Sequence, residues 1–215
     1  MSGPDRVLLF DLDGTLIDSI PLILASLRFA LTEHGVLPPD DDTLVSGIGT
    51  PLRTQLKRYA PDALRVEAMF LTYKAHNLAH HDASIRAFEG VVGVVEALRA
   101  RGAILGVVTS KMRDIARRGL EISGLSEAFP LLIGLEDTER HKPDPDPVIE
   151  ALRRLSASAA SATYIGDSPH DLRAGRRAGV RTVGVKWGPF PLSQLVDEAP
   201  DLLFDRPAEL LTLLD

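Results

Sequence analysis

The sequence predicts an α/β protein built on a parallel β-sheet with helices on both faces. Short apolar runs alternate with segments of helical spacing along most of the 215 residues, the order that is typical of parallel sheets. The runs are continuously apolar, as expected for strands that are buried on both faces. Residues from about 18 to 84 contain no such run, so we expect a helical lobe inserted after the first strand.

The individual elements follow from the same patterns. The strongest strand candidates are Arg6–Phe10, Ile104–Val108, Ala162–Ile165 and Arg181–Val185, and the weaker ones are Leu131–Ile133 and Leu202–Phe204. Helical patterns cover Val91 to Leu98 with Gly102 as a stop, Ile115 to Ile122, Val148 to Leu155 and Leu172 to Ala178. In the inserted lobe, Ile20–His34 and Ala63–His81 have helical spacing, and "LPPDDD" and "SGIGTPL" are interpreted as connections.

The composition narrows the class of protein. The formal net charge is −6, without the basic excess of a nucleic-acid or anionic-membrane binder. The chain has no cysteine, which excludes disulfides, thiolate metal sites and cysteine nucleophiles. The opening residues "MSGPDR" lack the pattern of a signal peptide, and no apolar run approaches the roughly 20 residues of a membrane-spanning helix. These observations predict a cytoplasmic protein with neither nucleic-acid nor membrane partners.

Polar residues follow the predicted strands at the point where each strand ends. Asp11 and Asp13 come after the first strand, Thr109 and Ser110 after "ILGVV", and Asp167 after "TYIG". Asp171 lies four residues beyond Asp167, and Lys142 precedes a predicted helix in "RHKPDPDP". In a parallel sheet the carboxyl ends of the strands share one edge, where ligands bind. We therefore expect these groups to converge on one site.

The residue types in this set suit phosphoryl chemistry. Carboxylate oxygens are ligands that Mg²⁺ prefers, and a bound cation allows like-charged carboxylates to lie together. The Lys142 ammonium, the hydroxyls of Thr109 and Ser110 and backbone amides after Asp11, such as that of Gly14, would cradle a phosphoryl group.

The two aspartates after the first strand suit two different roles. Asp11 can attack phosphorus as a nucleophile and form an aspartyl-phosphate. Asp13 projects to the same side of an extended chain, where it can protonate the leaving oxygen and then accept a proton from water.

Four motifs in order resemble those of the haloacid dehalogenase-like hydrolases. They are "DLDGTL" at residues 11–16, the Thr109–Ser110 pair, "KPDP" at residues 142–145 and "GDSPHD" at residues 166–171. The resemblance implies a Rossmann-like core over residues 1–16 and 85–215 and an α-helical cap over residues 17–84. It also implies Mg²⁺ held by Asp11, Asp13 (through its backbone carbonyl) and Asp167, with Thr109 and Lys142 binding phosphate. Asp171 is as consistent with the metal's surroundings as with helix capping.

Within this family the chain is most similar to the phosphoglycolate phosphatases and pyrophosphatases. "VVTSKMRD", "HKPDPDPV" and the segment that begins "GDSPHD" resemble that branch, and "YKAHNLAHHD" resembles a stretch of its pyrophosphatases. Asp13 excludes the true dehalogenases, which lack a carboxylate there. The resemblance implies a phosphatase that acts on a small phosphorylated metabolite or on pyrophosphate, as a monomer or homodimer.

Three other functions stay open. A β-phosphoglucomutase would use the same aspartyl-phosphate, although its cap-loop lysine and arginine are replaced here by Ser46 and Thr50. A phospho-receiver module also uses aspartate, threonine and lysine around Mg²⁺, but it would place its acidic residues on different strands. A pseudo-enzyme that only binds is disfavoured by the intact set of motif residues.

Two other patterns are weak. "GIGTP" lacks the full dinucleotide-binding fingerprint and follows no strand. His76 and His80 lie four residues apart, but they have no evident third metal ligand, and we interpret them as cap-surface or substrate-facing residues.

Overall fold

A computed structural model describes residues 6–215, and its main feature is a six-stranded parallel sheet. The strand order is β5-β4-β1-β6-β7-β8, so the first strand lies in the interior of the sheet. The strands are β1 (Val7–Phe10), β4 (Ile104–Val108), β5 (Leu131–Ile133), β6 (Ala162–Gly166), β7 (Arg181–Val185) and β8 (Leu202–Phe204). All six coincide with predicted runs to within one residue at either end, which confirms the α/β fold class.

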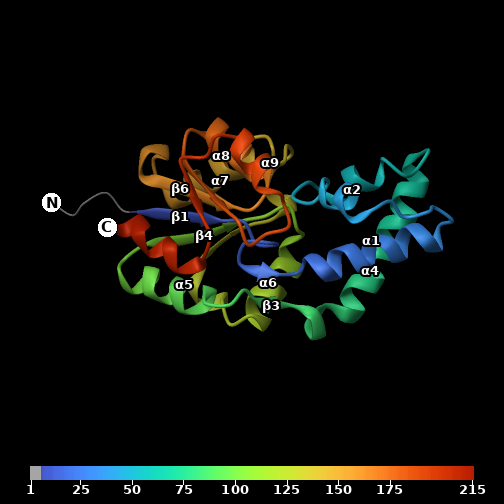
Figure 1. The fold of residues 1–215 in the computed structure, drawn as a ribbon, viewed down its shortest axis with the longest axis horizontal. Coiled ribbons are helices and arrows are strands. Elements are labelled where there is room, and N and C mark those ends of the chain that lie inside the picture. The colour runs from blue at the N-terminus through green and yellow to red at the C-terminus, as the bar shows by residue number, and fades with distance from the viewer. Residues whose placement is uncertain (1–5) are drawn as a thin grey trace.

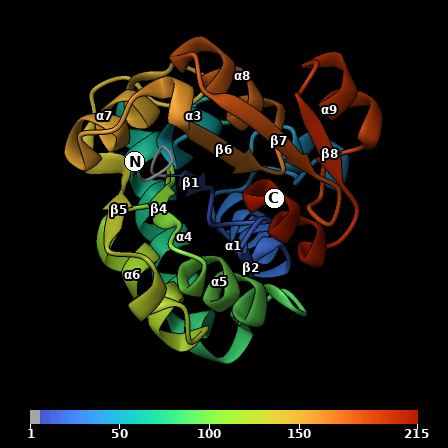
Figure 2. The same cartoon turned by 90° about the vertical axis from the view of Figure 1, so that its left-hand side faces the viewer.

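Helices cover both faces of the sheet (Figure 2). They are α5 (Val91–Ala100), α6 (Arg113–Ile122), α7 (Asp146–Leu155), α8 (Pro169–Ala178) and α9 (Leu192–Asp197), with 3₁₀ segments at Ser126–Ala128, Leu135–Asp137, Ala159–Ser161 and Pro207–Leu214. Strand β1 contributes side chains to the hydrophobic cores on both faces of the sheet, because its alternate side chains point to opposite faces. Leu8 and Phe10 pack with residues of α5 and α6, whereas Val7 and Leu9 pack with residues of α7 and α8.

Four helices form a lobe beside the carboxyl edge of the sheet, seen at the right of Figure 1. They are α1 (Ile20–Glu33), α2 (Asp41–Val45), α3 (Leu52–Leu56) and α4 (Ala63–Ser84), and α1 packs along α4. The side chains of Asp40 and Asp62 accept hydrogen bonds from the backbone amides of Thr43 and Arg65, which caps α2 and α4 at their N-termini.

The expected connections in this lobe are partly helical. Helix α2 begins inside "LPPDDD" and α3 begins at the end of "SGIGTPL". Both are only five residues long, which is too short for an apolar period to be visible in the sequence. The division into a core of residues 1–16 and 85–215 and a cap of residues 17–84 stays a prediction, and residues 1–5 lie outside the described range.

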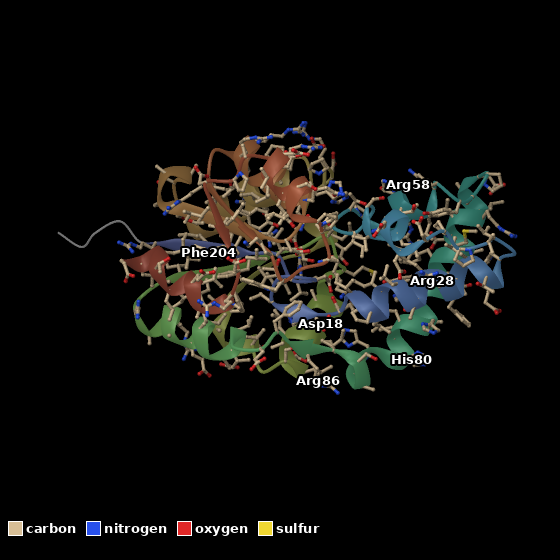
Figure 3. All side chains as sticks on the ribbon, viewed as in Figure 1. Asp18, Arg28, Arg58, His80, Arg86 and Phe204 are labelled. Atoms are coloured by element: carbon tan, nitrogen blue, oxygen red, sulfur yellow. The ribbon has the colours of Figure 1, made fainter. Side chains whose placement is uncertain are left out.

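A two-stranded antiparallel ribbon joins the lobe to the sheet, and no strand was expected there. Strand β2 (Ile17–Asp18) pairs with β3 (Arg86–Ala87), with Asp18 opposite Arg86. Figure 3 labels both residues at this junction. Two residues per strand carry no readable alternation, so the sequence gives no signal for them. The ribbon brings both ends of the lobe together at one place.

No helix within residues 6–215 has the length and apolar character to cross a bilayer.

Candidate active site

Three buried aspartates meet at the carboxyl edge of the sheet. Asp11 follows β1, Asp167 follows the neighbouring strand β6, and Asp171 lies in the first turn of α8. Each offers a carboxylate oxygen that lies within 4.8 Å of the others, and their exposed fractions are 3%, 1% and 0%. Asp11 and Asp167, which are 156 positions apart in the chain, are therefore brought together by the pairing of β1 with β6.

The ammonium of Lys142 connects two of these carboxylates. Its Nζ donates to Asp11 Oδ1 at 2.7 Å and to Asp171 Oδ1 at 2.6 Å. Burial alone would lower the pKa of Lys142, but the charges of Asp11 and Asp171 outweigh it and raise the pKa well above the usual value. The lysine is therefore a fixed cation. Asp171 is held in addition by Ser168 and by the Tyr164 hydroxyl, at 2.5 Å and 3.1 Å.

The cluster has more negative charge than one lysine can balance. Burial, followed by the charges of neighbouring aspartates, raises the pKa of Asp167 well above its usual value. Burial likewise raises the pKa of Asp11, to about 7, against the opposing effect of Lys142. Oδ2 of Asp167 is buried without a hydrogen-bond partner. An orphaned carboxylate oxygen in an acidic cluster is what a hard divalent cation would satisfy, so this donor set fits a metal ion.

Three glycines, which lack a Cβ atom, make room for the side chains of Asp167 and Asp171. Gly14 has φ +88°, and a Cβ there would lie 2.5 Å from Asp167 Oδ2. A Cβ on Gly188 would lie 2.3 Å from Asp167 Cβ, and one on Gly166 would lie 2.4 Å from Asp171 Cβ. Any side chain at these positions would displace a carboxylate.

Asp13 is not part of the three-aspartate cluster, although it lines the same cleft as Asp11. Its Oδ1 accepts hydrogen bonds from Ser19 Oγ and Lys111 Nζ, both at 2.5 Å. The side chains of Asp13 and Lys111 each keep 13% of their surface exposed, so both reach the solvent-accessible cleft. Asp11 and Asp13 thus have different surroundings although only one residue separates them.

The loop between these aspartates and β2 is held from two sides. Thr15 Oγ1 donates to Asp167 Oδ1 at 2.7 Å, and Trp187 Nε1 donates to the Thr15 carbonyl at 3.0 Å. The backbone amide of Gly14 donates to the Ile17 carbonyl at 3.0 Å. The amide that was predicted to cradle phosphate therefore has an acceptor at the first residue of β2.

Thr109 and Ser110 follow β4 and line the same cleft. The Thr109 hydroxyl accepts a hydrogen bond from the Lys111 amide at 3.2 Å. Ser110 donates its hydroxyl to the carbonyl of Gly49, in the loop between α2 and α3, at 2.7 Å. The serine therefore ties the sheet edge to the helical lobe.

The cleft between the lobe and the sheet has a volume of about 810 Å³, part of it open to solvent. Asp11, Asp13, Thr109 and Lys142 form its floor, whereas apolar side chains of the lobe such as Ile23 and Phe70 line the opposite wall. All the predicted site residues except Gly14 and Asp167 line this cleft. Asp167 lies beside Asp11 of the floor, and Gly14 lies against Asp167.

Sequence reasoning missed several residues of the site. Lys111 was quoted only as part of a motif, although its position directly after Thr109–Ser110 was a usable signal. Tyr164 belongs to a predicted strand and Trp187 follows another, so their hydrogen bonds at the site had no sequence signal. His76 lies away from the aspartate cluster, where its ring stacks on Phe29.

Comparison with known proteins identifies relatives of this chain. The family model for haloacid dehalogenase-like hydrolases matches residues 8–185. A protein of Caldanaerobacter subterraneus, provisionally named pyrophosphatase PpaX, is 40% identical over 96% of this chain and 93% of its own length. Pyrophosphatase PpaX of Anoxybacillus flavithermus is 37% identical over 97% of this chain and 96% of its own.

A solved structure shows the same architecture. A protein from Bacteroides fragilis, described as a haloacid dehalogenase-like hydrolase, superposes with a TM-score of 0.90 at 28% identity. The match covers 96% of this chain and 99% of that one. The resemblance inferred from the four motifs is thus confirmed. The chain belongs to the haloacid dehalogenase-like hydrolase family, in its branch of phosphoglycolate phosphatase-like and pyrophosphatase proteins.

Proposed function

We propose that this protein is a Mg²⁺-dependent phosphatase that hydrolyses a small phosphorylated substrate, with pyrophosphate favoured, through a phosphorylated Asp11. The observation that carries the proposal is the bridge from Lys142 to Asp11 and Asp171, beside Asp167, at the sheet edge. Pyrophosphate is favoured because relatives that match nearly the whole chain are named pyrophosphatases.

The residues that would hold Mg²⁺ are Asp11, Asp167 and the backbone carbonyl of Asp13. The unpartnered Oδ2 of Asp167 supports this assignment. A bound Mg²⁺ would neutralise the carboxylates and the charge of the transferring phosphoryl group. Asp171 has three partners in Lys142, Ser168 and Tyr164, so it serves better to position Lys142 than to bind the ion.

The reaction takes two steps on this chain's own residues. Asp11 attacks phosphorus, an Asp11–phosphorus bond forms and the bond to the leaving oxygen breaks, while Asp13 gives its proton to that oxygen. A water molecule then attacks the phosphorylated Asp11 and gives its proton to Asp13, which releases inorganic phosphate and restores Asp11. Lys142 and Thr109 would hold the phosphoryl oxygens, and the helical lobe would limit the access of water.

Phosphate release by the purified protein tests the proposal. The substrates are pyrophosphate, phosphoglycolate, a sugar phosphate and p-nitrophenyl phosphate, each with Mg²⁺ and with EDTA. We expect Mg²⁺-dependent release that EDTA abolishes and that the Asp11→Asn variant lacks while it keeps the wild-type circular dichroism spectrum. Phosphate release that survives chelation would contradict the proposed Mg²⁺ dependence. Substantial phosphate release by Asp11→Asn would contradict the proposed role of Asp11 as the nucleophile.

The same assay separates the alternatives. A phosphomutase would convert the sugar phosphate into an isomer without net phosphate release. A phospho-receiver or binding module would show no turnover with any of the four substrates. No contact at Ser46 or Thr50 favours a mutase, because both hydroxyls donate to carbonyls inside the lobe.

A further inference from the structure

Two lysines line the cleft beyond the groups that the reaction uses. Lys111 lies directly after Thr109–Ser110 at the sheet edge, and Lys74 lies in α4 on the facing wall. Lys142, the third cation of the cleft, is committed to Asp11 and Asp171. The cleft therefore has positive charge in addition to the lysine assigned to the transferring phosphoryl group.

The two lysines differ in their partners. Lys111 Nζ lies 2.5 Å from Asp13 Oδ1, which is its one ion pair within residues 6–215. Lys74 is half-buried and makes no ion pair in the described part of the chain. One cation thus lies beside the proposed proton donor, and the other faces the cleft uncommitted.

The position of Lys111 beside Asp13 determines which part of a substrate it would meet. Asp13 gives its proton to the leaving oxygen in the proposed reaction, so the leaving group must lie against Asp13. The Lys111 ammonium touches Oδ1 of that carboxylate, so it lies beside the place that the leaving group would occupy. Lys111 therefore faces the leaving group rather than the phosphoryl group that is transferred.

The neutral polar groups of this wall are already engaged within the lobe. Gln55 Nε2 donates to the Thr50 carbonyl at 2.8 Å, and Thr50 Oγ1 donates to the Gly47 carbonyl at 2.6 Å. Asn77 Nδ2 donates to Ser26 Oγ and to the Tyr73 hydroxyl, at 3.3 Å and 3.4 Å. A leaving group with many hydroxyls would find few free partners there, whereas the two ammonium groups remain for an anion.

We propose that Lys111, assisted by Lys74, binds a negatively charged leaving group and so selects substrates whose leaving group is anionic. The second phosphoryl group of pyrophosphate and the carboxylate of phosphoglycolate both meet this requirement, and an uncharged sugar or phenol does not. The inference rests on the proposed function for its orientation of the substrate. Apolar neighbours such as Ile115 and Met112 lower the local dielectric and strengthen the attraction.

Binding of a non-hydrolysable analogue tests the inference without turnover. The ligands are imidodiphosphate, which carries both phosphoryl groups, and orthophosphate, which carries one, each titrated calorimetrically with Mg²⁺. We expect Lys111→Met to weaken imidodiphosphate at least about tenfold, the loss typical of one charge-assisted hydrogen bond, and orthophosphate no more than about twofold. Lys111→Arg should recover most of the loss because it keeps the charge.

Lys74→Met and Lys57→Met complete the series. Lys74→Met should weaken imidodiphosphate in the same direction, and it serves as a second test if Lys111→Met does not fold. Lys57, an exposed residue of the lobe outside the cleft, is the matched control and should change neither ligand. Equal weakening of both ligands by Lys111→Met, or no weakening of either, would overturn the inference, as would a wild-type protein that does not bind imidodiphosphate.

Turnover identifies the kind of anion and separates the two proposals. Lys111→Met should lower the ratio of kcat/KM for pyrophosphate to that for p-nitrophenyl phosphate about tenfold, and the same ratio for phosphoglycolate if a carboxylate also binds there. Lysine-dependent binding of imidodiphosphate without hydrolysis of any substrate would refute the proposed function and leave the anion site standing. Hydrolysis with unchanged ratios would refute the anion site alone.

Discussion

The ammonium of Lys142 lies 2.7 Å from Oδ1 of Asp11, and its side chain keeps 1% of its surface exposed. Removal of a buried cation leaves its carboxylate partners uncompensated. We expect Lys142→Met to lose activity and to lower the free energy of unfolding by about 3 kcal/mol, the scale for breaking a buried ion pair. Urea unfolding in metal-free buffer measures the change.

Lys186 provides the matched control for this prediction. It pairs with Asp205, whose side chain is 64% exposed, and such surface pairs contribute at most about 1 kcal/mol. Lys186→Met should therefore be close to neutral. A loss of stability in Lys142→Met no larger than that of Lys186→Met would show that the charge of Lys142 does not hold the site together.

Asp13→Asn tests the division of roles between the two neighbouring aspartates. The amide oxygen can still accept from Ser19 and Lys111, but the group cannot carry a proton. We expect kcat to fall about 10²- to 10⁴-fold, the usual contribution of general acid–base catalysis. p-Nitrophenolate leaves without a proton, so the variant should release one equivalent in a burst and then stall as phosphoenzyme.

Stopped-flow absorbance and intact-protein mass measure the burst and the added phosphate. The Asp11→Asn variant is the control, because it lacks the attacking carboxylate and should give neither. An Asp13→Asn variant that turns over within about tenfold of wild type, without a burst, would assign the proton transfer to another group.

The sheet and the convergence of the site could be predicted because they depend on residue pattern alone. The run Val7–Phe10 is apolar at every position, and it proved to be an interior strand that supplies both cores. Once the strands are parallel, the polar groups after Phe10, Val108 and Gly166 must lie at one edge. The order of the strands in the chain and the residue types after them were therefore enough to predict that Asp11 and Asp167 lie close together.

The hydrogen-bond partners at the site could not be predicted, because they depend on loop backbone that leaves no periodic signal. The Gly14 amide donates to Ile17, and Ser110 donates to a lobe carbonyl, whereas both had been assigned to phosphate. From the sequence, the position of Asp171 was as consistent with capping a helix as with a place near the metal ion. In the structure it caps α8 and also holds Lys142, so one carboxylate has both tasks.

Gly14→Ala tests how closely the loop approaches Asp167. The residue has φ +88°, where a non-glycine residue costs about 1–2 kcal/mol, and its Cβ would lie 2.5 Å from Asp167 Oδ2. We expect this modest loss of stability together with a much larger loss of activity and a higher Mg²⁺ concentration for half-maximal rate. Metal titrations of the rate and urea unfolding measure the two effects.

Gly102→Ala separates backbone strain from the clash. Gly102 has φ +84°, and a Cβ there would meet nothing within 4 Å. Its replacement should lose similar stability and keep the wild-type response to Mg²⁺. If Gly14→Ala and Gly102→Ala retain the same activity, Asp167 tolerates displacement and is not held in place by Gly14.

The surroundings of His81 lead us to expect that stability depends on pH. Its ring is fully buried and lies against Gly119 of α6. Its Nδ1 lies 3.1 Å from the Asp82 carboxylate, and Asp82 also pairs with Arg118. Nε2 has no partner. Burial lowers the pKa of His81 below its usual value of 6.5, aided by the charges of Lys111 and Arg118 and opposed by Asp82.

The sign of the effect follows from proton binding. Below about pH 6.5 the unfolded chain protonates this imidazole, while the folded protein keeps it neutral until the lowered pKa is reached. The unfolded state then binds more protons, so stability must fall as the pH falls. The contribution of His81 is complete above pH 6.5 and is lost through the range down to its folded pKa.

His81→Asn removes this titration, and its readout is the slope of unfolding free energy against pH. Urea unfolding between pH 7.5 and 5.5 should show a shallower acid loss than in wild type, whatever stability the smaller side chain costs at pH 7.5. His80→Asn is the control, because His80 is exposed on the same helix. Parallel slopes in wild type and His81→Asn would mean that the junction accepts the protonated ring without cost.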